Sequence, residues 1–230
     1  MINKVIPVKE AVEKIPDGAT IMFGGFMGCG NAHRLIGELA GSGKGGFTII
    51  SNDASMPGGP IGDEHYGIAK LIHNRQVKKL IATHVGLNPE VAAQEQAGEL
   101  ELVLIPQGSF AEMIRAGGAG LGGVLTPTGV GTLVEENPYA EGRVAVDGRD
   151  YLLMKPLTAD IAIIAGYYVD KIGNVWYKGT MRNFSAVMAT AADVVIAEAA
   201  HIVEVGDIVP ENVMTSSIFV DYVVPGLGGA

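Results

Sequence analysis

A short run of glycines is the stretch of this 230-residue chain whose residue types and spacing point most directly to chemistry. Residues 24–30 read Gly-Gly-Phe-Met-Gly-Cys-Gly and lie between an apolar, strand-like segment and a helix-like segment that opens at Asn31. Glycine allows positive φ and lets a ligand touch the main chain. A helix start adds unpaired N–H groups and the positive end of a dipole. The run predicts a site for a phosphate-bearing ligand, with a tight structural turn as an equally supported alternative.

The spacing of these glycines excludes two common nucleotide-binding motifs. No Gly-Lys-Ser/Thr follows the run, so it is not a P-loop. Gly24, Gly25, Gly28 and Gly30 do not fit Gly-x-Gly-x-x-Gly, and the nearest acid to the position that a dinucleotide site requires is Asp53.

Other reactive side chains give weaker signals. Cys29 is the single cysteine and lies beside the expected helix start, a position that activates thiols, but no base is placed near it. We therefore expect Cys29 to line the turn rather than to act as a nucleophile. The histidines at positions 33, 65, 73, 84 and 201 show no metal-binding spacing, and we expect no metal site. If the chain is an enzyme, some of the catalytic groups that it needs must be missing from this chain.

Strand-like and helix-like segments alternate along the chain, and this order predicts how the polar residues are positioned. The alternation predicts an α/β fold with an open, mainly parallel sheet, helices on both faces and small antiparallel hairpins in the second half. Ligands bind beyond the carboxyl ends of such strands, so the polar groups at 52–53, at 84–88 and at Gln107 are further candidates. The strands are expected at 20–24, 47–51, 77–83, 100–105, 161–165 and 193–198.

The remaining segments predict one domain over residues 1–230. Ser109 has the type of an N-cap for a helix through Arg115. Residues 117–123, Gly-Gly-Ala-Gly-Leu-Gly-Gly, are expected to be an irregular loop. The sequence Val-Asp-Gly-Arg at 146–149 predicts a hairpin turn, and residues 169–177 predict a second hairpin.

Composition excludes several classes of function. The net charge is −9 and no basic cluster is present, so nucleic acid is a poor partner. No apolar run reaches the length of a membrane span, and residues 1–10 lack the apolar core of a signal peptide. A single cysteine allows no internal disulfide, and these features together predict a cytoplasmic protein.

The residues from Asp17 to Phe26, Asp-Gly-Ala-Thr-Ile-Met-Phe-Gly-Gly-Phe, closely resemble the signature of the alpha (A) subunit of family I CoA-transferases. This family includes 3-oxoacid, acetoacetate, butyrate and acetate CoA-transferases. Gly30 fills the last glycine position of the signature, and Ala32 stands where the family often has proline. Further family-like blocks occur in order at 51–53, 98–101, 106–108, 114–120, 126–129, 173–174 and 182–184.

The resemblance implies that the chain is one half of an enzyme with a sugar-isomerase/CoA-transferase-like fold. The family forms a glutamyl–CoA thioester, through a mixed anhydride, on a glutamate in a Ser-Glu-Asn-Gly segment of the beta subunit. This chain has no such segment, and Glu135 and Glu136 are followed by Asn-Pro. The implied protein is an alpha subunit in a heterotetramer or larger assembly, with acyl-CoA and a short-chain carboxylic or 3-oxo acid as substrates and no tightly bound cofactor.

The resemblance also implies roles for individual residues. Asn52 and Gln107 match polar positions that face the partner's glutamate, where neutral amides can orient a carboxylate and stabilise an oxyanion. Contact with coenzyme A is implied for the glycine run, that is for Gly24, Gly25, Phe26, Met27, Gly28, Cys29 and Gly30.

Two other functions stay open. One is an acyl-CoA hydrolase or a transferase that uses a dicarboxylate. The other, a non-catalytic ligand-sensing module of the same fold, would require a DNA-binding appendage that the sequence lacks. The loop from Met56 to Tyr66 looks longer than in typical relatives and could alter access to the site, and residues 117–123 are expected to pack closely near the subunit interface.

Overall fold

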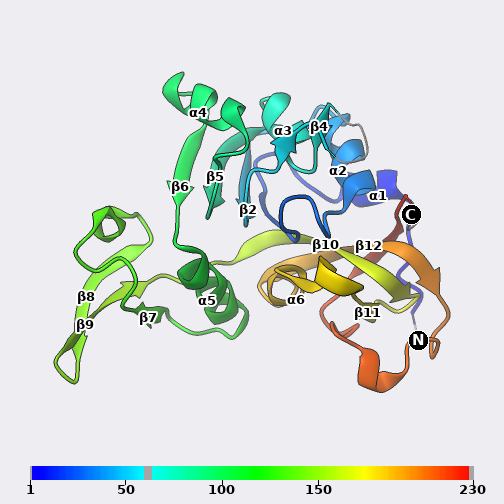
Figure 1. Cartoon of the computed structure of the whole chain (residues 1–230). Coiled ribbons are helices and arrows are strands. Elements are labelled where there is room, and N and C mark those ends of the chain that lie inside the picture. The colour runs from blue at the N-terminus through cyan, green and yellow to red at the C-terminus, as the bar shows by residue number, and fades with distance from the viewer. Residues whose placement is uncertain (1, 60–63, 228–230) are drawn as a thin grey trace.

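Seven parallel strands form the centre of the protein, shown in Figure 1. The structure, a computed structural model, describes residues 2–59 and 64–227. In this part of the chain the strand order is β13-β12-β10-β1-β2-β5-β6, and β11 pairs antiparallel with β10. The strands are β1 (Thr20–Phe23), β2 (Phe47–Ser51), β5 (Val77–Ala82), β6 (Glu101–Leu104), β10 (Ala159–Asp170), β11 (Val175–Trp176), β12 (Ala192–Val203) and β13 (Tyr222–Pro225).

Alternate side chains of β1 enter two cores, one on each face of the sheet. Ile21 and Phe23 belong to the core that includes residues of α1, α2, α3 and α4, whereas Met22 belongs to the core that includes residues of α5 and α6. The predicted α/β fold is therefore confirmed. The helices are α1 (Val8–Glu13), α2 (His33–Ala40), α3 (Ala69–His73), α4 (Pro89–Gln96), α5 (Gln107–Gly118) and α6 (Ser185–Met188), with short 3-10 turns η1 (Leu133–Glu136), η2 (Gly179–Arg182) and η3 (Pro210–Asn212). Across residues 2–59 and 64–227, no helix is both long and apolar enough to span a membrane.

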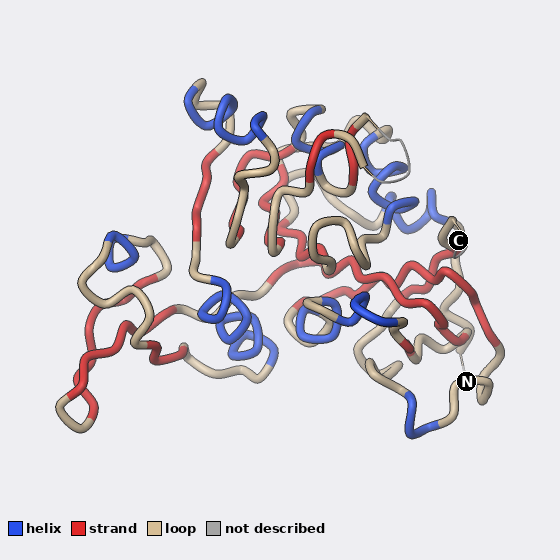
Figure 2. The backbone as a smooth tube through the Cα atoms, in the orientation of Figure 1, coloured by secondary structure: helices blue, strands red, loops and turns tan. Residues whose placement is uncertain are grey.

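Two small antiparallel sheets are added to this centre. Strands β7 (Val124–Thr126), β9 (Arg149–Met154) and β8 (Ala140–Val146) form an arm that projects from the main sheet (Figure 2). Asp147 and Gly148 take φ values of 50° and 76° at the β8–β9 turn, which confirms the predicted hairpin. The β10–β11 pair confirms the second hairpin.

The segment from Met56 to Tyr66, which the sequence predicts as an irregular loop, contains a short antiparallel pair. Strands β3 (Met56–Pro57) and β4 (His65–Tyr66) pair with each other. Residues 60–63 of this segment lie outside the described residues.

The predicted start of α2 is wrong because Asn31, a residue type that often caps helices, holds the preceding turn instead. The helix begins at His33 rather than at Asn31. The Asn31 side chain donates from Nδ2 to the carbonyl oxygen of Gly24 at 2.6 Å.

The predicted start of α5 is also wrong, and the irregular loop expected at 117–123 is confirmed only for residues 119–123. The helix begins at Gln107, before Ser109, and continues through Gly118. A Cβ at Gly117 would lie 2.0 Å from the carbonyl oxygen of Leu157. Gly117 therefore lets the end of the helix pack closely against the chain that leads into β10, and Gly118 does the same against Thr190, before β12.

Candidate functional site

Gln107 and Asn52, the two amides predicted at strand ends, are in direct contact. Gln107 is exposed at the start of α5, and its Nε2 donates to Asn52 Oδ1 at 2.6 Å. Asn52 follows β2 and is 1% exposed, and its Oδ1 also accepts from the Thr83 hydroxyl at 3.2 Å. Asn52 is thus used within the chain, and Gln107 is the amide that a second molecule can reach.

Asp53 connects this amide pair to the glycine turn, by which we mean residues 24–30. Asp53 Oδ2 accepts from Asn52 Nδ2 and from the Met27 N–H, both at 2.8 Å. Its Oδ1 accepts from the Ser55 N–H, also at 2.8 Å. Met27 has a φ of 52°, which is unfavourable for a residue with a side chain. The hydrogen bond to the carboxylate helps to hold the turn in that conformation.

Asn183 holds the glycine turn from the other side. Its Oδ1 accepts from the Gly25 N–H at 3.1 Å, and its Nδ2 donates to the carbonyl oxygen of Cys29 at 3.0 Å. The same Nδ2 donates to the carbonyl oxygen of Thr180 at 2.8 Å. In the sequence, Asn183 is visible only as part of a family-like block, and its role in the turn follows from the fold.

The glycines of the turn are required by contacts within the chain. A Cβ at Gly25 would lie 2.1 Å from Asn31 Nδ2, and a Cβ at Gly28 would lie 1.8 Å from the Tyr66 ring. The alternative interpretation, a tight structural turn without a ligand, thus accounts for Gly25 and Gly28. Contact of these glycines with a ligand stays a prediction. At Gly24 and Gly30 the corresponding neighbours are Ser185 Oγ, at 2.4 Å, and the carbonyl oxygen of Met181, at 2.8 Å.

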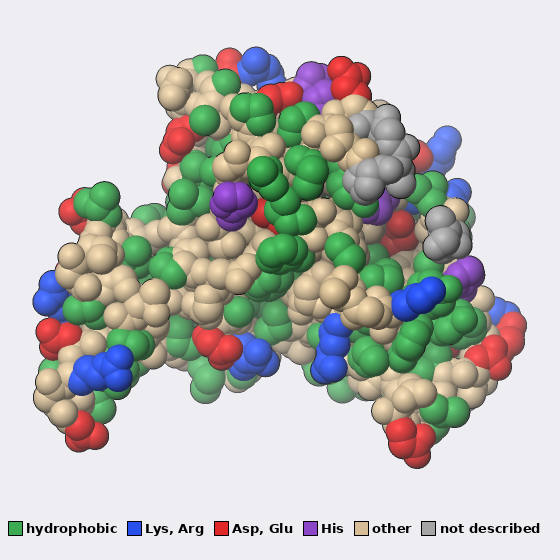
Figure 3. Space-filling model, viewed as in Figure 1, with side chains coloured by type: hydrophobic (Ala, Val, Ile, Leu, Met, Phe, Trp, Pro, Cys, Tyr) green, Lys and Arg blue, Asp and Glu red, His purple; other side chains and the backbone are tan. Residues whose placement is uncertain are grey.

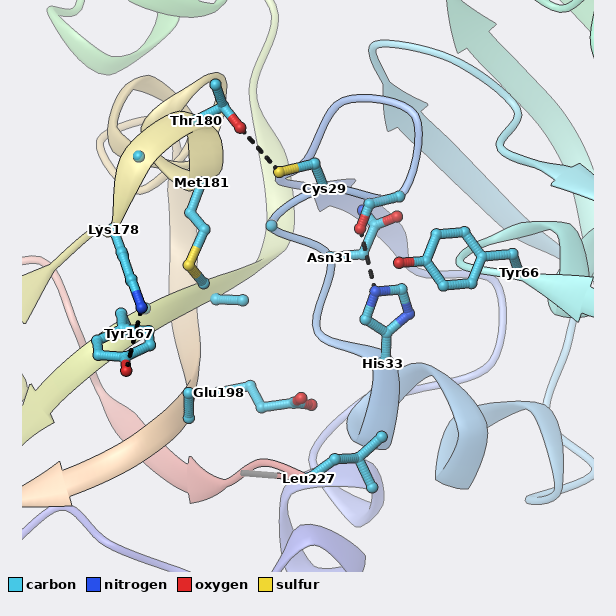
Figure 4. Close-up of a pocket in the computed structure, with 16 residues that line it drawn as sticks. Cys29, Asn31, His33, Tyr66, Tyr167, Lys178, Thr180, Met181, Glu198 and Leu227 are labelled. Atoms are coloured by element: carbon cyan, nitrogen blue, oxygen red, sulfur yellow. Dashed lines mark hydrogen bonds between the residues drawn. The ribbon is translucent and has the colours of Figure 1, made fainter. Parts of the chain in front are cut away.

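A pocket of about 520 Å³ opens beside residues 28–30 of the turn (Figure 4). Its walls include Lys178, Glu198 and Tyr66, which come from separate parts of the chain. Cys29 also lines it, with Sγ 3.1 Å from Thr180 Oγ1. A concave site of this size, with apolar walls and a few polar groups, fits part of a small organic ligand.

The N-terminus of α2 is already occupied by a carboxylate. Glu198, on β12, accepts from the Leu35 N–H at 2.7 Å and from the Arg34 N–H at 3.3 Å. Ala32, at the N-cap, has no side chain that could do this. The expectation that this helix start offers unpaired N–H groups to a ligand is therefore wrong for Arg34 and Leu35.

Burial controls the charge of Glu198, whose side chain faces the pocket in Figure 4. Burial raises the pKa of Glu198 to about 7, although the N–H groups of Leu35 and Arg34 and the positive charge of Arg34 favour the carboxylate. Glu198 therefore keeps its proton to a higher pH than an exposed glutamate does.

The other polar residues predicted at strand ends, those at 84–88, make contacts within the chain. His84 is exposed and pairs with Asp53 in an isolated parallel bridge. Asn88 caps α4, where its side chain accepts from the Glu90 N–H at 3.2 Å. The polar strand ends are thus brought together at one edge of the sheet, but only part of the set is free to meet a ligand.

The sequence does not predict the walls of the pocket. Glu198 carries one signal, as an acid inside the apolar run of residues 192–203, whereas Tyr66 and Lys178 carry none. The histidines likewise show no metal-binding spacing, yet the fold places His65 and His73 beside Glu90. Spacing along the chain is therefore a poor guide to this cluster.

Comparison with known proteins extends over almost the whole chain. The family model described as Coenzyme A transferase matches residues 5–226. The alpha subunit of the acetoacetyl-CoA:acetate/butyrate CoA transferase of Clostridium acetobutylicum is 45% identical over 224 residues, which cover 97% of this chain and 98% of that protein. The 3-oxoadipate CoA-transferase of Acinetobacter baylyi has a corresponding subunit that is 42% identical over 230 residues, which cover 98% of this chain and 96% of that protein.

A solved structure shares the fold. An acyl-CoA transferase of Escherichia coli O157:H7, in a thioester complex with CoA, superposes with a TM-score of 0.85 at 24% identity. The superposition covers 99% of this chain and 50% of the solved chain, so this chain spans about half the length of that structure. At this identity the likeness shows the fold alone.

Proposed function

Because this chain belongs to the coenzyme A transferase family, we propose that it is the alpha subunit of a two-subunit CoA-transferase. The enzyme moves CoA from an acyl-CoA to a short-chain carboxylic or 3-oxo acid. The covalent intermediate is a glutamyl–CoA thioester on the partner beta subunit, and this chain supplies the surroundings in which it forms and reacts.

The observation that carries the proposal is the exposed Gln107 amide held in place by Asn52. Asn52 in turn contacts Thr83 and Asp53, and the Asp53 carboxylate is 4% exposed and accepts from three N–H donors. Such a carboxylate is a poor nucleophile because its lone pairs are already engaged. The arrangement suits binding of a reacting group that another chain brings.

In this proposal Gln107 acts on the partner's glutamate. Its exposed amide can donate to the carboxylate before reaction and to the oxyanion of a tetrahedral intermediate afterwards. One such donor contributes about 3–4 kcal/mol to the transition state in other acyl-transfer enzymes. A neutral amide also leaves the carboxylate more nucleophilic than a paired cation would. Asn52 serves as a positioning residue, since its amide is used within the chain.

Coenzyme A is proposed to lie along residues 28–30 of the glycine turn and in the adjoining pocket. The backbone of this part of the turn lines the pocket, whereas Gly24 and Gly25 are packed against protein groups. Phe26, which closes the turn by pairing with Cys29, is 44% exposed and can pack on the pantetheine or on the partner. Lys178, in the pocket wall, supplies a cation for an anionic group of the substrate.

Exposed hydrophobic side chains around the site support a partner that covers it. Leu104, the last residue of β6, is 46% exposed, and Leu87, in the segment between β5 and α4, is 48% exposed. Figure 3 shows that the middle of the face seen there is largely hydrophobic or uncharged, with charged side chains mainly around its margin. Such a surface is typical of protein–protein contacts.

Reconstitution tests the proposal. The purified chain is mixed with its partner subunit, acetyl-CoA and either butyrate or acetoacetate, and the acyl-CoA products are separated by chromatography. We expect butyryl-CoA or acetoacetyl-CoA from the mixture and none from either chain alone. A reconstituted complex that forms neither product, nor any other acyl-CoA, would refute the proposal.

A second candidate differs in the acceptor. The Acinetobacter baylyi relative is named for 3-oxoadipate, a dicarboxylate, and is nearly as similar as the Clostridium acetobutylicum protein. Offering monocarboxylates and dicarboxylates in parallel distinguishes these acceptors. Free CoA released without any acceptor acid would instead indicate a hydrolase.

A further inference from the structure

Two histidines and a glutamate from three different elements converge on one side of the protein. His65 lies in β4, His73 ends α3, and Glu90 is in the first turn of α4. His65 Nε2 and His73 Nδ1 each lie 3.1 Å from Glu90 Oε1. One donor atom from each residue lies within 4.8 Å of the others. The segments that carry them are thus joined through a single carboxylate.

The geometry of this cluster suits a cation. One imidazole nitrogen from each histidine lies at hydrogen-bond distance from the same Glu90 carboxylate oxygen. A divalent ion between these atoms would take the place of protons there, which would pass to the other ring nitrogens or to solvent, and would keep the same three groups together.

We propose that His65, His73 and Glu90 form a binding site for a divalent transition-metal ion, with Zn²⁺ the best match. Two imidazoles and one carboxylate are a common zinc ligand set, in which water fills the fourth position. The two imidazole nitrogens each lie 3.1 Å from Glu90 Oε1, near the separation of ligands that lie about 2.0–2.2 Å from one tetrahedral ion.

Binding requires a small change in one side chain. The two imidazole rings are stacked, with centroids 3.8 Å apart and planes inclined by 28°. Both nitrogens can point at one ion only if one ring turns. The His73 side chain is 51% exposed and can make this rotation, whereas the His65 side chain is 13% exposed and stays in place.

The site has a structural role in this proposal because His65 is adjacent to Tyr66. The Tyr66 ring lies where a Cβ of Gly28 would be, and it lines the pocket beside the glycine turn. An ion that ties β4 to α3 and α4 would therefore fix the wall of the pocket from outside. The reacting groups of the proposed transfer reaction are not ligands of this ion.

The test measures zinc binding by the full chain after any affinity tag has been removed. Zn²⁺ is titrated in competition with a chromophoric chelator, for the wild type and for His73→Ala and Glu90→Gln. His201→Ala is the matched control, since it removes an imidazole that lies outside the cluster. We expect one equivalent to bind the wild type and His201→Ala, with affinity at least about tenfold lower in the other two variants. Absence of stoichiometric binding by the wild type, or equal affinity in all four proteins, would overturn the proposal.

A second measurement tests the effect on the pocket wall and does not depend on enzyme activity. Hydrogen exchange at residues 64–67 is followed with and without Zn²⁺. We expect Zn²⁺ to slow exchange there in the wild type and to leave it unchanged in a folded Glu90→Gln variant, which keeps the size of the side chain. Exchange that is insensitive to Zn²⁺ in the wild type would overturn the structural role.

Discussion

Gln107 Nε2 donates to Asn52 Oδ1 at 2.6 Å and thereby joins the segments that follow β6 and β2 across the end of β5. These residues are 55 positions apart in the chain. This hydrogen bond holds the exposed amide of Gln107 against the buried amide of Asn52. The proposed role of Gln107 depends on this position.

Replacing Gln107 by alanine is expected to lower kcat of the reconstituted enzyme about 100-fold, because one donor to the developing oxyanion is lost. Assembly with the partner should be unchanged, since truncation of most single interface side chains costs little binding energy. Gln96→Ala, at an exposed position of α4, is the matched control. Steady-state kinetics and size-exclusion chromatography provide the measurements. Unchanged kcat in a stable complex would remove Gln107 from the site.

Replacing Asn52 by alanine is expected to destabilise the fold by about 1–3 kcal/mol, because Asp53 and Gln107 each lose a buried or partly buried partner. The free energy of unfolding is measured by denaturant titration for each single variant and for the Asn52→Ala, Gln107→Ala double variant. We expect a coupling energy of about 0.5–1.5 kcal/mol. Strict additivity would show that the contact contributes nothing to stability.

Replacing Asp53 by alanine should loosen the glycine turn, because the Met27 N–H loses its acceptor. Hydrogen exchange at residues 27–30 should become faster, and KM for acyl-CoA should rise in the reconstituted enzyme. Asp17→Ala is the control, since Asp17 also accepts from a backbone N–H, that of Gly45, in another turn. If both variants behave alike, Asp53 has no special role in the turn.

Replacing Glu198 by glutamine is expected to change how stability depends on pH. The pKa of Glu198 is raised from 4.5 to about 7, so the folded state binds more protons than the unfolded state between these values. The wild type therefore loses stability as pH rises from about 4.5 to 7, by at most roughly 3 kcal/mol from this group. The neutral glutamine variant should not show this loss. Thermal unfolding from pH 5 to pH 8 measures the difference, and parallel curves would contradict the assignment.

Replacing Gly28 by alanine should destabilise the protein more than replacing Gly43. Both glycines have similar positive φ, 82° and 77°, so the backbone cost of a side chain, about 1 kcal/mol, is shared. A Cβ at Gly28 meets the Tyr66 ring, whereas a Cβ at Gly43 meets nothing within 4 Å. Equal melting temperatures for the two variants would show that Tyr66 moves away at no cost.

The strands of the sheet could be predicted because the residue pattern of each segment matches the structure that it adopts in the fold. The apolar runs of β1 and β2, and the run Leu80–Ala82 at the end of β5, are typical of strands buried on both faces, and turn residues separate them from helices. The resemblance then identified Asn52 and Gln107, which the sheet brings into contact.

The pocket and the helix starts were not predictable, because they depend on contacts between distant segments. Asn31 has the residue type of a helix cap, but it bonds to Gly24, and the α2 N-terminus is capped by Glu198, which is 163 residues from Leu35. His65 and His73 meet only because β4 packs beside α3. Neither arrangement leaves a periodic pattern in the sequence.

The position of β1 in the middle of the sheet has a consequence during synthesis. One of its edges pairs with β2 soon after both strands leave the ribosome, but the other edge must wait for β10, since Ile21 pairs with Ile161. At about 5–20 residues per second, translation of the intervening chain takes on the order of 10 s. A nascent or stalled chain that ends before Ala159 therefore exposes one unpaired edge of the strand that leads into the glycine turn. An exposed strand edge of this kind can pair with another nascent chain.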